Sequence, residues 1–154
     1  MKLKDELLKI TECLDHAGVD YGLCGGLAVV VHGYPRLTKD IDILIQPESL
    51  ESAKEHLAKI EYDLEAGLFR FNHGTSNENL MYRVSRAVGT ELTTLDLMLV
   101  APAFEEVWAS REVIQLGEHR LKVVSKEGLI TMKQLSGRPQ DLADIDALNR
   151  IEKR

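Results

Sequence analysis

Three aspartates carried by two apolar segments are the residues of this sequence best suited to chemistry. Asp40 and Asp42 flank Ile41 at the start of an apolar run that continues through Ile45. Side chains two residues apart on a β-strand point to the same side, so these two carboxylates are expected to lie close together. Like charges that close raise each other's pKa and destabilise the fold unless a cation lies between them. Mg²⁺ is suited to that place, because it binds one or two carboxylates and keeps positions for water and phosphate oxygens.

Asp96 lies in a second apolar run, residues 93–99, which predicts another strand. Alternating leucines share one face of that strand, and Asp96 interrupts the opposite face. A carboxylate in so apolar a strand costs several kcal/mol unless it is paired, exposed at the end of the sheet or bound to a metal. One interpretation is a buried Asp96 that is hydrogen-bonded to backbone or to an arginine. The other is a third ligand, which would complete a divalent-ion site with Asp40 and Asp42.

The Asp-x-Asp spacing by itself is a weak indicator, because so short a motif also occurs by chance. Asp144 and Asp146 form a second such pair. The pattern around them predicts a helix, on which side chains two residues apart point about 200° away from each other. The prediction for Asp40 and Asp42 therefore depends on their apolar strand and on Asp96, and not on the spacing alone.

Two consecutive glycines, Gly25 and Gly26, follow a short predicted strand and begin an apolar helix that runs to about His32. Glycine lets backbone amides approach a ligand closely, and the N-terminus of a helix favours negative charge. The pair is therefore a candidate phosphate-binding turn. The simpler interpretation is a tight connection between strand and helix. His32, at the end of the helix, is expected to be a packing or capping residue.

The remaining pattern predicts a mixture of helices and strands. Helices are expected at residues 3–16, 25–32, 47–60, 102–108, 126–135 and 139–151, and strands at 21–24, 41–45, 68–71, 80–84, 93–100, 113–116 and 120–124. This order favours an α/β (α+β) fold in which helices cover a mixed β-sheet. Because the chain has 154 residues and no repeat or long linker, it is expected to form one domain, residues 1–154.

The composition is that of a soluble globular protein, with 44% hydrophobic and 29% charged residues. A formal net charge of -6 argues against an extended surface for DNA or RNA, although local basic groups could still hold a nucleotide. Cys13 and Cys24 fit no disulfide or metal-binding spacing and are expected to be reduced thiols. No stretch is apolar enough to span a membrane and no signal peptide is recognisable, so a cytoplasmic location is expected.

Taken together, these features resemble the nucleotidyltransferase (polymerase-beta-like) superfamily. The family pattern is an apolar strand, Gly-Gly or Gly-Ser, a helix, an h-D-x-D-h strand and a third carboxylate on a later strand. The corresponding segments here read YGLCGGLAVVVHGYPRLTKDIDILI and TTLDLMLV. The spacing from Gly26 to Asp40, with Arg36 and Thr38 between them, is most similar to a bacterial branch. That branch contains toxins of abortive-infection and toxin–antitoxin systems, and small enzymes that modify lincosamides and aminoglycosides.

The C-terminal part of the sequence extends this resemblance. Lys133, followed by the run from Gly137 to Ile145, resembles the Lys…Arg-x-x-Asp-x-x-Asp-hydrophobic ending of the toxin-like group. The likeness covers about residues 20–150. Its motifs are more specific for the fold than for the acceptor of the reaction.

The resemblance implies a magnesium-dependent transfer of a nucleoside monophosphate from a triphosphate, such as ATP, to a hydroxyl of a tRNA, a protein or a small molecule. Asp40 and Asp42 would bind Mg²⁺, and Asp96 would complete the site and could act as base on the hydroxyl. A second ion could assist the attacking and leaving oxygens. Nucleotide-binding roles are implied for Gly25, Gly26, Arg36, Thr38, Lys133, Arg138 and Asp141.

Other interpretations of the same residues stay open. The chain could be a nucleotide-binding or regulatory member of a toxin–antitoxin pair without turnover, or a nucleotidyltransferase fold that has lost catalysis. Lys133 could be an exposed helix position, and Thr38 could only shape the turn before the strand. Asp141 and Asp144 follow Pro139 at a helix start, where acids are favoured regardless of function. Because little length is left for an acceptor domain, a homodimer or a protein partner could complete the cleft.

Overall fold

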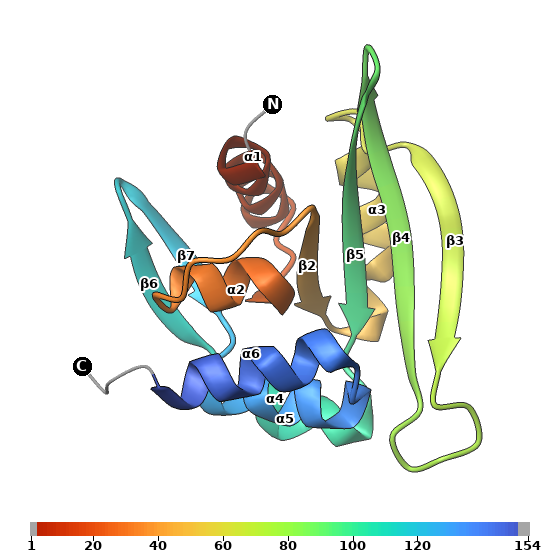
Figure 1. The fold of residues 1–154 in the computed structure, drawn as a ribbon. Helices are drawn as coiled ribbons and strands as arrows, with labels where there is room; N and C mark the ends of the chain where they lie inside the picture. Colours follow the sequence, from red (N-terminus) through yellow and green to blue (C-terminus); the bar gives the residue numbers. More distant parts are fainter. Residues whose placement is uncertain (1–2, 151–154) are drawn as a thin grey trace.

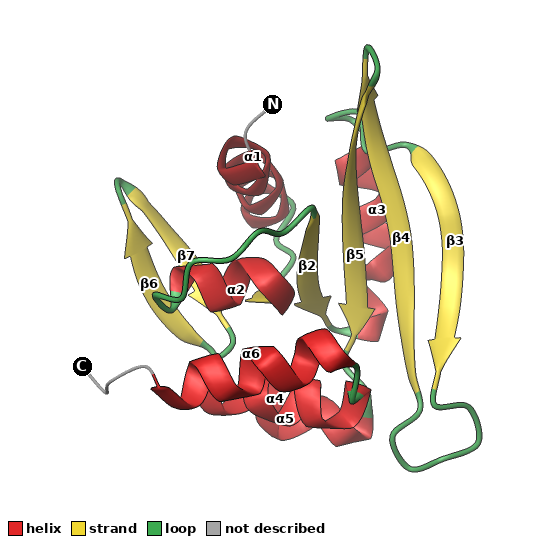
Figure 2. Ribbon diagram, viewed as in Figure 1, coloured by secondary structure: helices red, strands yellow, loops and turns green. Residues whose placement is uncertain are grey.

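The computed structural model describes residues 3–150, in which helices surround a single β-sheet (Figure 1, Figure 2). The helices are α1 (Leu3–His16), α2 (Gly25–Val31), α3 (Leu50–Ala58), α4 (Glu105–Ala109), α5 (Lys126–Ser136) and α6 (Pro139–Arg150). The strands are β1 (Gly22–Cys24), β2 (Asp40–Ile45), β3 (Leu64–Phe71), β4 (Asn79–Val88), β5 (Glu91–Leu99), β6 (Glu112–Leu116) and β7 (His119–Val123). The predicted sequence of helices and strands is confirmed.

The seven strands form one mixed sheet in the order β3-β4-β5-β2-β1-β7-β6. Strand β2 is parallel to β5 and β1 is parallel to β7, whereas the other neighbours are antiparallel. Strand β2, which carries Asp40 and Asp42, is therefore central and lies next to β5, which carries Asp96. The expected α/β fold with a helix-covered mixed sheet is confirmed.

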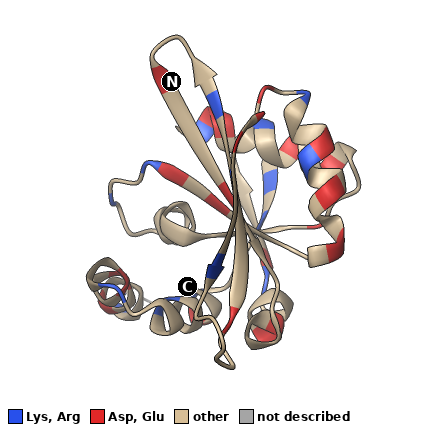
Figure 3. Cartoon of the chain, turned by 90° about the vertical axis from the view of Figure 1, so that its right-hand side faces the viewer, with Lys and Arg blue, Asp and Glu red and all other residues tan. Residues whose placement is uncertain are grey.

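Strand β2 has two different faces because its side chains alternate. Ile41, Ile43 and Ile45 are fully buried and belong to the same core as the apolar faces of α1 and α3. Asp40 and Asp42 alternate with these isoleucines and are only partly buried. Helices cover both sides of the sheet (Figure 3). The core thus anchors β2 through one face and leaves the carboxylates on the other.

The predicted boundaries differ from the structure mainly at the ends of elements. The third predicted helix begins with one 3-10 turn, Pro47–Ser49, before α3 starts. The strand predicted at 68–71 already begins at Leu64, because the ladder with β4 continues past an irregularity next to Gly67. The predicted end of the last helix, Ile151, lies outside the described residues.

Two helices near the centre of the sheet are fixed at their ends by specific hydrogen bonds. His32 caps α2, and its Nε2 lies 2.9 Å from the carbonyl oxygen of Val124, which confirms the predicted capping role. The next residue, Ser125, caps the start of α5, and its hydroxyl accepts a hydrogen bond from the backbone N–H of Gly128. Helix α5 ends at Gly137 in the left-handed conformation. One short stretch therefore holds the end of α2 and the start of α5 together.

Two basic residues in the later part of the chain, Arg111 and Lys122, pair with one acid, Asp20. Asp20 accepts hydrogen bonds from Arg111 at 2.8 Å and from Lys122 at 2.6 Å. The Arg111 guanidinium also stacks on Trp108, 3.6 Å from the ring centroid. Positions of Lys and Arg are interspersed with positions of Asp and Glu along the chain (Figure 3). The absence of an extended DNA-binding surface stays a prediction.

Both cysteines are free thiols, as the sequence predicts. Burial raises the pKa of the Cys24 thiol well above its usual value, and the nearby charges of Asp42 and Asp96 act in the same direction. Among residues 3–150, no helix has the length and apolar character needed to cross a membrane.

Candidate active site

The aspartates of β2 and β5 form one row across the centre of the sheet. In the parallel ladder between these strands, Asp42 is paired with Asp96, and Asp40 is paired with Thr94. Paired positions on neighbouring strands place their side chains on the same face. Asp40, Asp42 and Asp96 are therefore brought together as predicted, and we call these three residues the carboxylate row.

The carboxylate row carries more negative charge than its surroundings compensate. Burial, together with the charges of Asp96 and Asp40, raises the pKa of Asp42 to about 7. The cations Lys133 and Arg138 act in the opposite direction but do not offset this rise. A cation at the row would relieve the repulsion.

Asp96 is held by an arginine that the sequence analysis did not identify. Arg83 of β4 lies opposite Asp96 in the antiparallel β4–β5 ladder. Its Nε donates to Asp96 Oδ1 at 2.8 Å, and its Nη2 donates to Asp96 Oδ2 at 3.0 Å. The Asp96 side chain is 5% exposed, so this bidentate pair satisfies a buried carboxylate. The interpretation of Asp96 as a buried, arginine-paired aspartate therefore matches its contacts in this structure.

A turn signal in the sequence could have located Arg83. Gly89 and Thr90 connect β4 to β5, and Val88 is paired with Glu91 across them. A glycine in a two-residue connection is typical of a tight β-hairpin. Counting outward from this turn leads to the pair Arg83 and Asp96, because the ladder is regular along its whole length.

The glycine turn lies directly against the carboxylate row. Gly25 has a φ of 66°, and a Cβ atom at this position would overlap the carboxylate of Asp42. A Cβ atom on Gly26 would lie 2.8 Å from Thr38 Oγ1 and 3.3 Å from Arg36 Cζ. Both glycines are therefore needed for the close approach of this turn to Asp42, Thr38 and Arg36.

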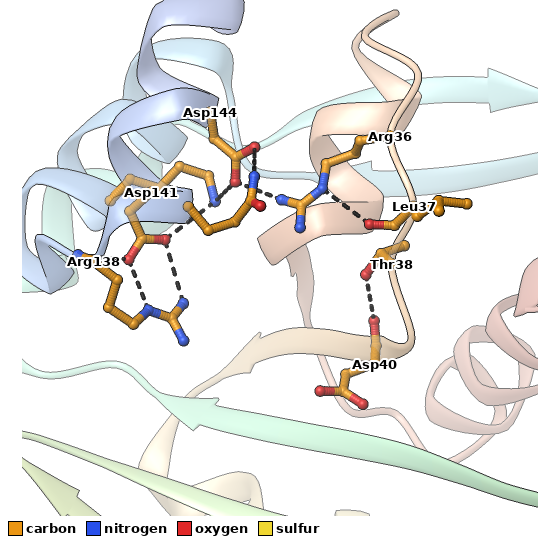
Figure 4. Close-up of polar contacts among 9 residues, drawn as sticks. Arg36, Leu37, Thr38, Asp40, Arg138, Asp141 and Asp144 are labelled. Carbon is orange, nitrogen blue, oxygen red and sulfur yellow. Dashed lines mark hydrogen bonds and ion pairs between the residues drawn. The ribbon is translucent and has the colours of Figure 1, made fainter.

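A second group of charged residues surrounds the start of α6 (Figure 4). Lys133 Nζ lies 2.9 Å from Asp144 Oδ2 and 3.7 Å from Asp141 Oδ1. Arg36 Nη1 lies 2.5 Å from Asp144 Oδ2, and Arg138 Nε lies 2.8 Å from Asp141 Oδ2. We call Arg36, Lys133, Arg138, Asp141 and Asp144 the ion-pair cluster.

The ion-pair cluster is compensated internally, in contrast to the carboxylate row. Asp141 and Asp144 are 2% and 1% exposed, and Lys133 is 7% exposed. The interpretation of Lys133 as an exposed helix position is therefore wrong. Burial alone would raise the pKa of Asp141, but hydrogen bonds from Arg138 and the charge of Lys133 outweigh burial and lower this pKa below its usual value.

Both groups border one cavity with a volume of about 990 Å³, which lies at the upper end of the range for small-molecule sites. The glycine turn, the carboxylate row and the ion-pair cluster all contribute to its lining. Every residue that the sequence analysis proposed for the site lines this cavity. The lining residues that come from β3 and β4, Arg83 among them, were not predicted from the sequence.

The chemistry of the carboxylate row fits a hard divalent cation, because its donors are carboxylate oxygens and its charge is uncompensated. Within residues 3–150, however, no group of three His, Cys, Asp or Glu side chains is arranged to hold a metal ion. Asp96 faces Arg83 with both of its oxygens. Asp40 and Asp42 are therefore the residues of the row best placed to hold an ion without rearrangement.

Comparison with known proteins identifies the family of this chain. Residues 3–154 match the family described as "Nucleotidyl transferase of unknown function (DUF2204)". The chain belongs to this family. The prediction of a nucleotidyltransferase enzyme is thereby confirmed. No curated protein is a significant match to the sequence.

Solved structures share the fold of this DUF2204 protein. The lincosamide antibiotic adenylyltransferase LnuA, solved with lincomycin bound, is 20% identical with a TM-score of 0.66, over 96% of this chain and 97% of that chain. The antibiotic-resistance factor ANT(2'')-Ia is 13% identical with a TM-score of 0.63, over 92% of this chain and 80% of that chain. The protein TM1012 from Thermotoga maritima is 14% identical with a TM-score of 0.62, over 95% and 93% of the two chains. At these identities the likeness shows the fold alone.

These comparisons confirm the predicted superfamily and the likeness in fold to small antibiotic nucleotidyltransferases. The magnesium ion, the bound nucleotide, the roles of single residues and a place in a toxin–antitoxin system stay predictions.

Proposed function

We propose that this protein transfers a nucleoside monophosphate from a magnesium-bound nucleoside triphosphate to a hydroxyl acceptor. The observation that carries the proposal is the shared cavity of the carboxylate row, the glycine turn and the ion-pair cluster. The carboxylate row needs a cation, and the glycine amides and the cluster's cations suit phosphate oxygens. A triphosphate with its magnesium ion supplies both a cation for the carboxylate row and anionic oxygens for the glycine turn and the ion-pair cluster.

The three carboxylates of the row would have different roles at the reacting end of the cavity. Asp40 and Asp42 would hold the ion, and Mg²⁺ would neutralise phosphate charge and orient the triphosphate when bound. Arg83 fixes the orientation of Asp96 through two hydrogen bonds, and each Asp96 oxygen keeps a second lone pair that could accept from the acceptor hydroxyl. Asp96 would accept the proton of the acceptor hydroxyl as its oxygen bonds to the α-phosphorus. The bond from that phosphorus to pyrophosphate breaks in the same step.

The remaining phosphates would lie along the glycine turn and the ion-pair cluster. The amides of Gly25 and Gly26 would hold the β- and γ-phosphates, with Arg36 and Lys133 beside them. Asp144 accepts from both of these cations and so fixes their positions before a nucleotide arrives. Thr38 donates to the Asp40 carbonyl oxygen at 3.3 Å, which shapes the turn before β2. We propose that the Thr38 hydroxyl also contacts a phosphate.

Arg138 and Asp141 extend this arrangement. Arg138 is 74% exposed along its side chain, so it can reach a phosphate while Asp141 anchors its guanidinium. Asp141 is buried and engaged with Arg138 and Lys133. We therefore assign Asp141 to positioning these cations in nucleotide binding.

A thermal-shift panel tests the proposal directly. ATP, GTP, CTP and UTP are each added with and without magnesium to the wild-type protein and to Asp42→Asn. A ligand at about 100 times its dissociation constant stabilises a protein by about 2.7 kcal/mol, or roughly 5 to 10 °C for a domain of this size. We expect a magnesium-dependent shift with at least one triphosphate in the wild type and none in Asp42→Asn.

The outcomes separate the alternatives. A shift that survives Asp42→Asn would show that the nucleotide binds elsewhere or without this carboxylate. No shift with any triphosphate would favour a fold that no longer catalyses, or a site that a partner must complete.

A further inference from the structure

One wall of the cavity is not used by the proposed binding of the triphosphate. Phe69 and Phe71 of β3, Met81 of β4 and Met98 of β5 all line the cavity. Phe69 is paired with Met81, and Met81 is paired with Met98, so these three side chains form a row on one face of the sheet. We call these four residues the apolar wall.

The apolar wall is continuous with the carboxylate row. Met98 follows Asp96 by two positions on β5, and Met81 precedes Arg83 by two positions on β4. Residues two apart on a strand lie on the same face, about 7 Å apart. A molecule packed on the wall therefore has Asp96 within reach of one of its hydroxyl groups.

Two aromatic rings of the wall are open to solvent. Phe69 is 40% exposed and Phe71 is 43% exposed, whereas Met81 is buried. Strand β3 is an edge strand, so packing from a neighbouring strand does not cover these rings on their outer side. Large aromatic side chains beside polar catalytic groups in a concave site are typical of the surface that packs against a ligand.

The charges around the wall bear on the kind of acceptor. Asp96 is paired with Arg83, and the two aspartates of the ion-pair cluster are paired with the cluster's cations. Asp40 and Asp42 are assigned to the ion. Among the described residues that line the cavity, no further Asp or Glu is left for a cationic group of an acceptor.

Arg83 lies at the border between the two regions, and its charge is matched by that of Asp96. Its guanidinium lies 5.7 Å from the centroid of the Phe69 ring, and its side chain is 40% exposed. A polycation placed on the apolar wall would give up water without finding an unpaired carboxylate for its ammonium groups. A neutral molecule with an apolar face would meet no such penalty.

We propose that the apolar wall is the acceptor subsite, and that it selects neutral hydroxyl compounds with an aromatic or alicyclic face over polycationic ones. This inference rests on the proposed function, because the hydroxyl is the group that attacks the α-phosphorus. The acceptor oxygen replaces pyrophosphate on that phosphorus and loses its proton, so the products are the nucleotidylated compound, pyrophosphate and a proton.

The test measures binding of two chemically opposed probes. The probes are 2-naphthol, a neutral fluorescent hydroxyl compound, and tobramycin, a hydroxyl-rich polycation. The protein is first loaded with magnesium and the triphosphate that gives the largest thermal shift, as a non-hydrolysable analogue. Phe71→Ser removes one open ring, and Leu68→Ser is the matched control, because Leu68 is 54% exposed on the opposite face of the same strand.

We expect 2-naphthol to bind the wild type more tightly than tobramycin does. Phe71→Ser should weaken 2-naphthol binding about tenfold, because the ligand loses its apolar contact with the ring, and Leu68→Ser should change it less than twofold. Tighter binding of tobramycin, no binding of 2-naphthol, or equal effects of the two variants would each overturn the proposal.

The thermal shift with magnesium and triphosphate separates this inference from the proposed function. Both variants should keep that shift, because neither residue belongs to the nucleotide end of the cavity. Absence of the shift in the wild type would count against the proposed function and not against the apolar wall. Sedimentation adds one further criterion: if Phe71→Ser converts a dimer to a monomer while 2-naphthol binding stays unchanged, the apolar wall is a subunit interface and not an acceptor subsite.

Discussion

The two groups of aspartates that border the cavity have opposite charge balances. In the carboxylate row, burial and neighbouring carboxylates raise the pKa of Asp42 to about 7. In the ion-pair cluster, Asp141 is at least as buried, yet hydrogen bonds from Arg138 and the charge of Lys133 outweigh burial and lower its pKa. The same side chain is therefore destabilised as an anion at one end of the cavity and stabilised at the other.

This difference teaches what each group is suited to do. The cluster satisfies its own charges, so its role is to hold Lys133 and two arginines in place. The row leaves a charge that a proton or an outside cation must neutralise. A buried aspartate is thus a candidate metal ligand where no neighbouring cation neutralises its charge. Where such cations are present, it is a structural residue.

The largest expected effect is on transfer itself. Asp96→Asn should reduce pyrophosphate release from the preferred triphosphate about 1000-fold, because it removes a charged oxygen from the reacting end of the cavity. The matched control is Asp63→Asn, an exposed acid just before β3. Wild-type turnover by Asp96→Asn would show that the row is not the catalytic centre.

The ion-pair cluster should respond in stability. Asp144→Asn removes the charge that Arg36 and Lys133 share, and breaking a buried ion pair costs about 3 kcal/mol. Asp146→Asn, two residues further on, is the control, since Asp146 pairs with Arg150 at the surface. Chemical denaturation measures both variants, and equal losses in the two would contradict the structural role of the cluster.

Protonation offers a test of the compensated aspartate. Because the folded-state pKa of Asp141 is lowered, its contribution to stability is present above its unfolded-state pKa and is lost as pH falls through its folded-state pKa. Asp141→Asn should therefore be less stable than the wild type by on the order of 1 kcal/mol at pH 7. Urea unfolding at pH 7 and near pH 3 should show this difference shrinking in acid, whereas a constant difference would argue against the assigned ion pairs.

The smallest expected effect has the opposite sign. In the presence of a chelator, Asp42→Asn should raise the melting temperature by roughly 2 °C, because it removes like-charge repulsion from the row. The same Asp→Asn change in the ion-pair cluster should instead lower the melting temperature, so the two groups are distinguished by the sign of the effect. A lower melting temperature for Asp42→Asn would mean that the structure compensates this carboxylate after all.

The centre of the site could be predicted from the sequence because strand periodicity places its residues. Alternation alone puts Asp40 and Asp42 on one face, and the matching apolar pattern around Asp96 predicts the strand beside them. The spacing of Asp141 and Asp144 likewise predicts one helical face. Whether those two aspartates meet Lys133 and Arg36 depends on how α6 packs against α5 and the loop, which local patterns do not determine.

The apolar wall could not be predicted from the sequence for a related reason. The turn-rich segment around Gly67 and Asn72 predicted only a short strand, and the irregularity next to Gly67 shifts the register of β3 on β4. A shift of one residue exchanges the two faces of a strand. The side on which Phe69 and Phe71 lie therefore follows from the pairing with β4, and not from the alternation of residues in β3.

The ion pair between Arg36 and Asp144 also has a consequence for how the protein folds during synthesis. These residues are 108 positions apart in the chain, and one bond ties the loop before β2 to the last described helix. Contacts of such long separation form late, and synthesis proceeds from the N-terminus. A nascent chain that has already made its carboxylate row therefore lacks the clamped Arg36 until α6 has emerged from the ribosome, so the phosphate end of the cavity is assembled last.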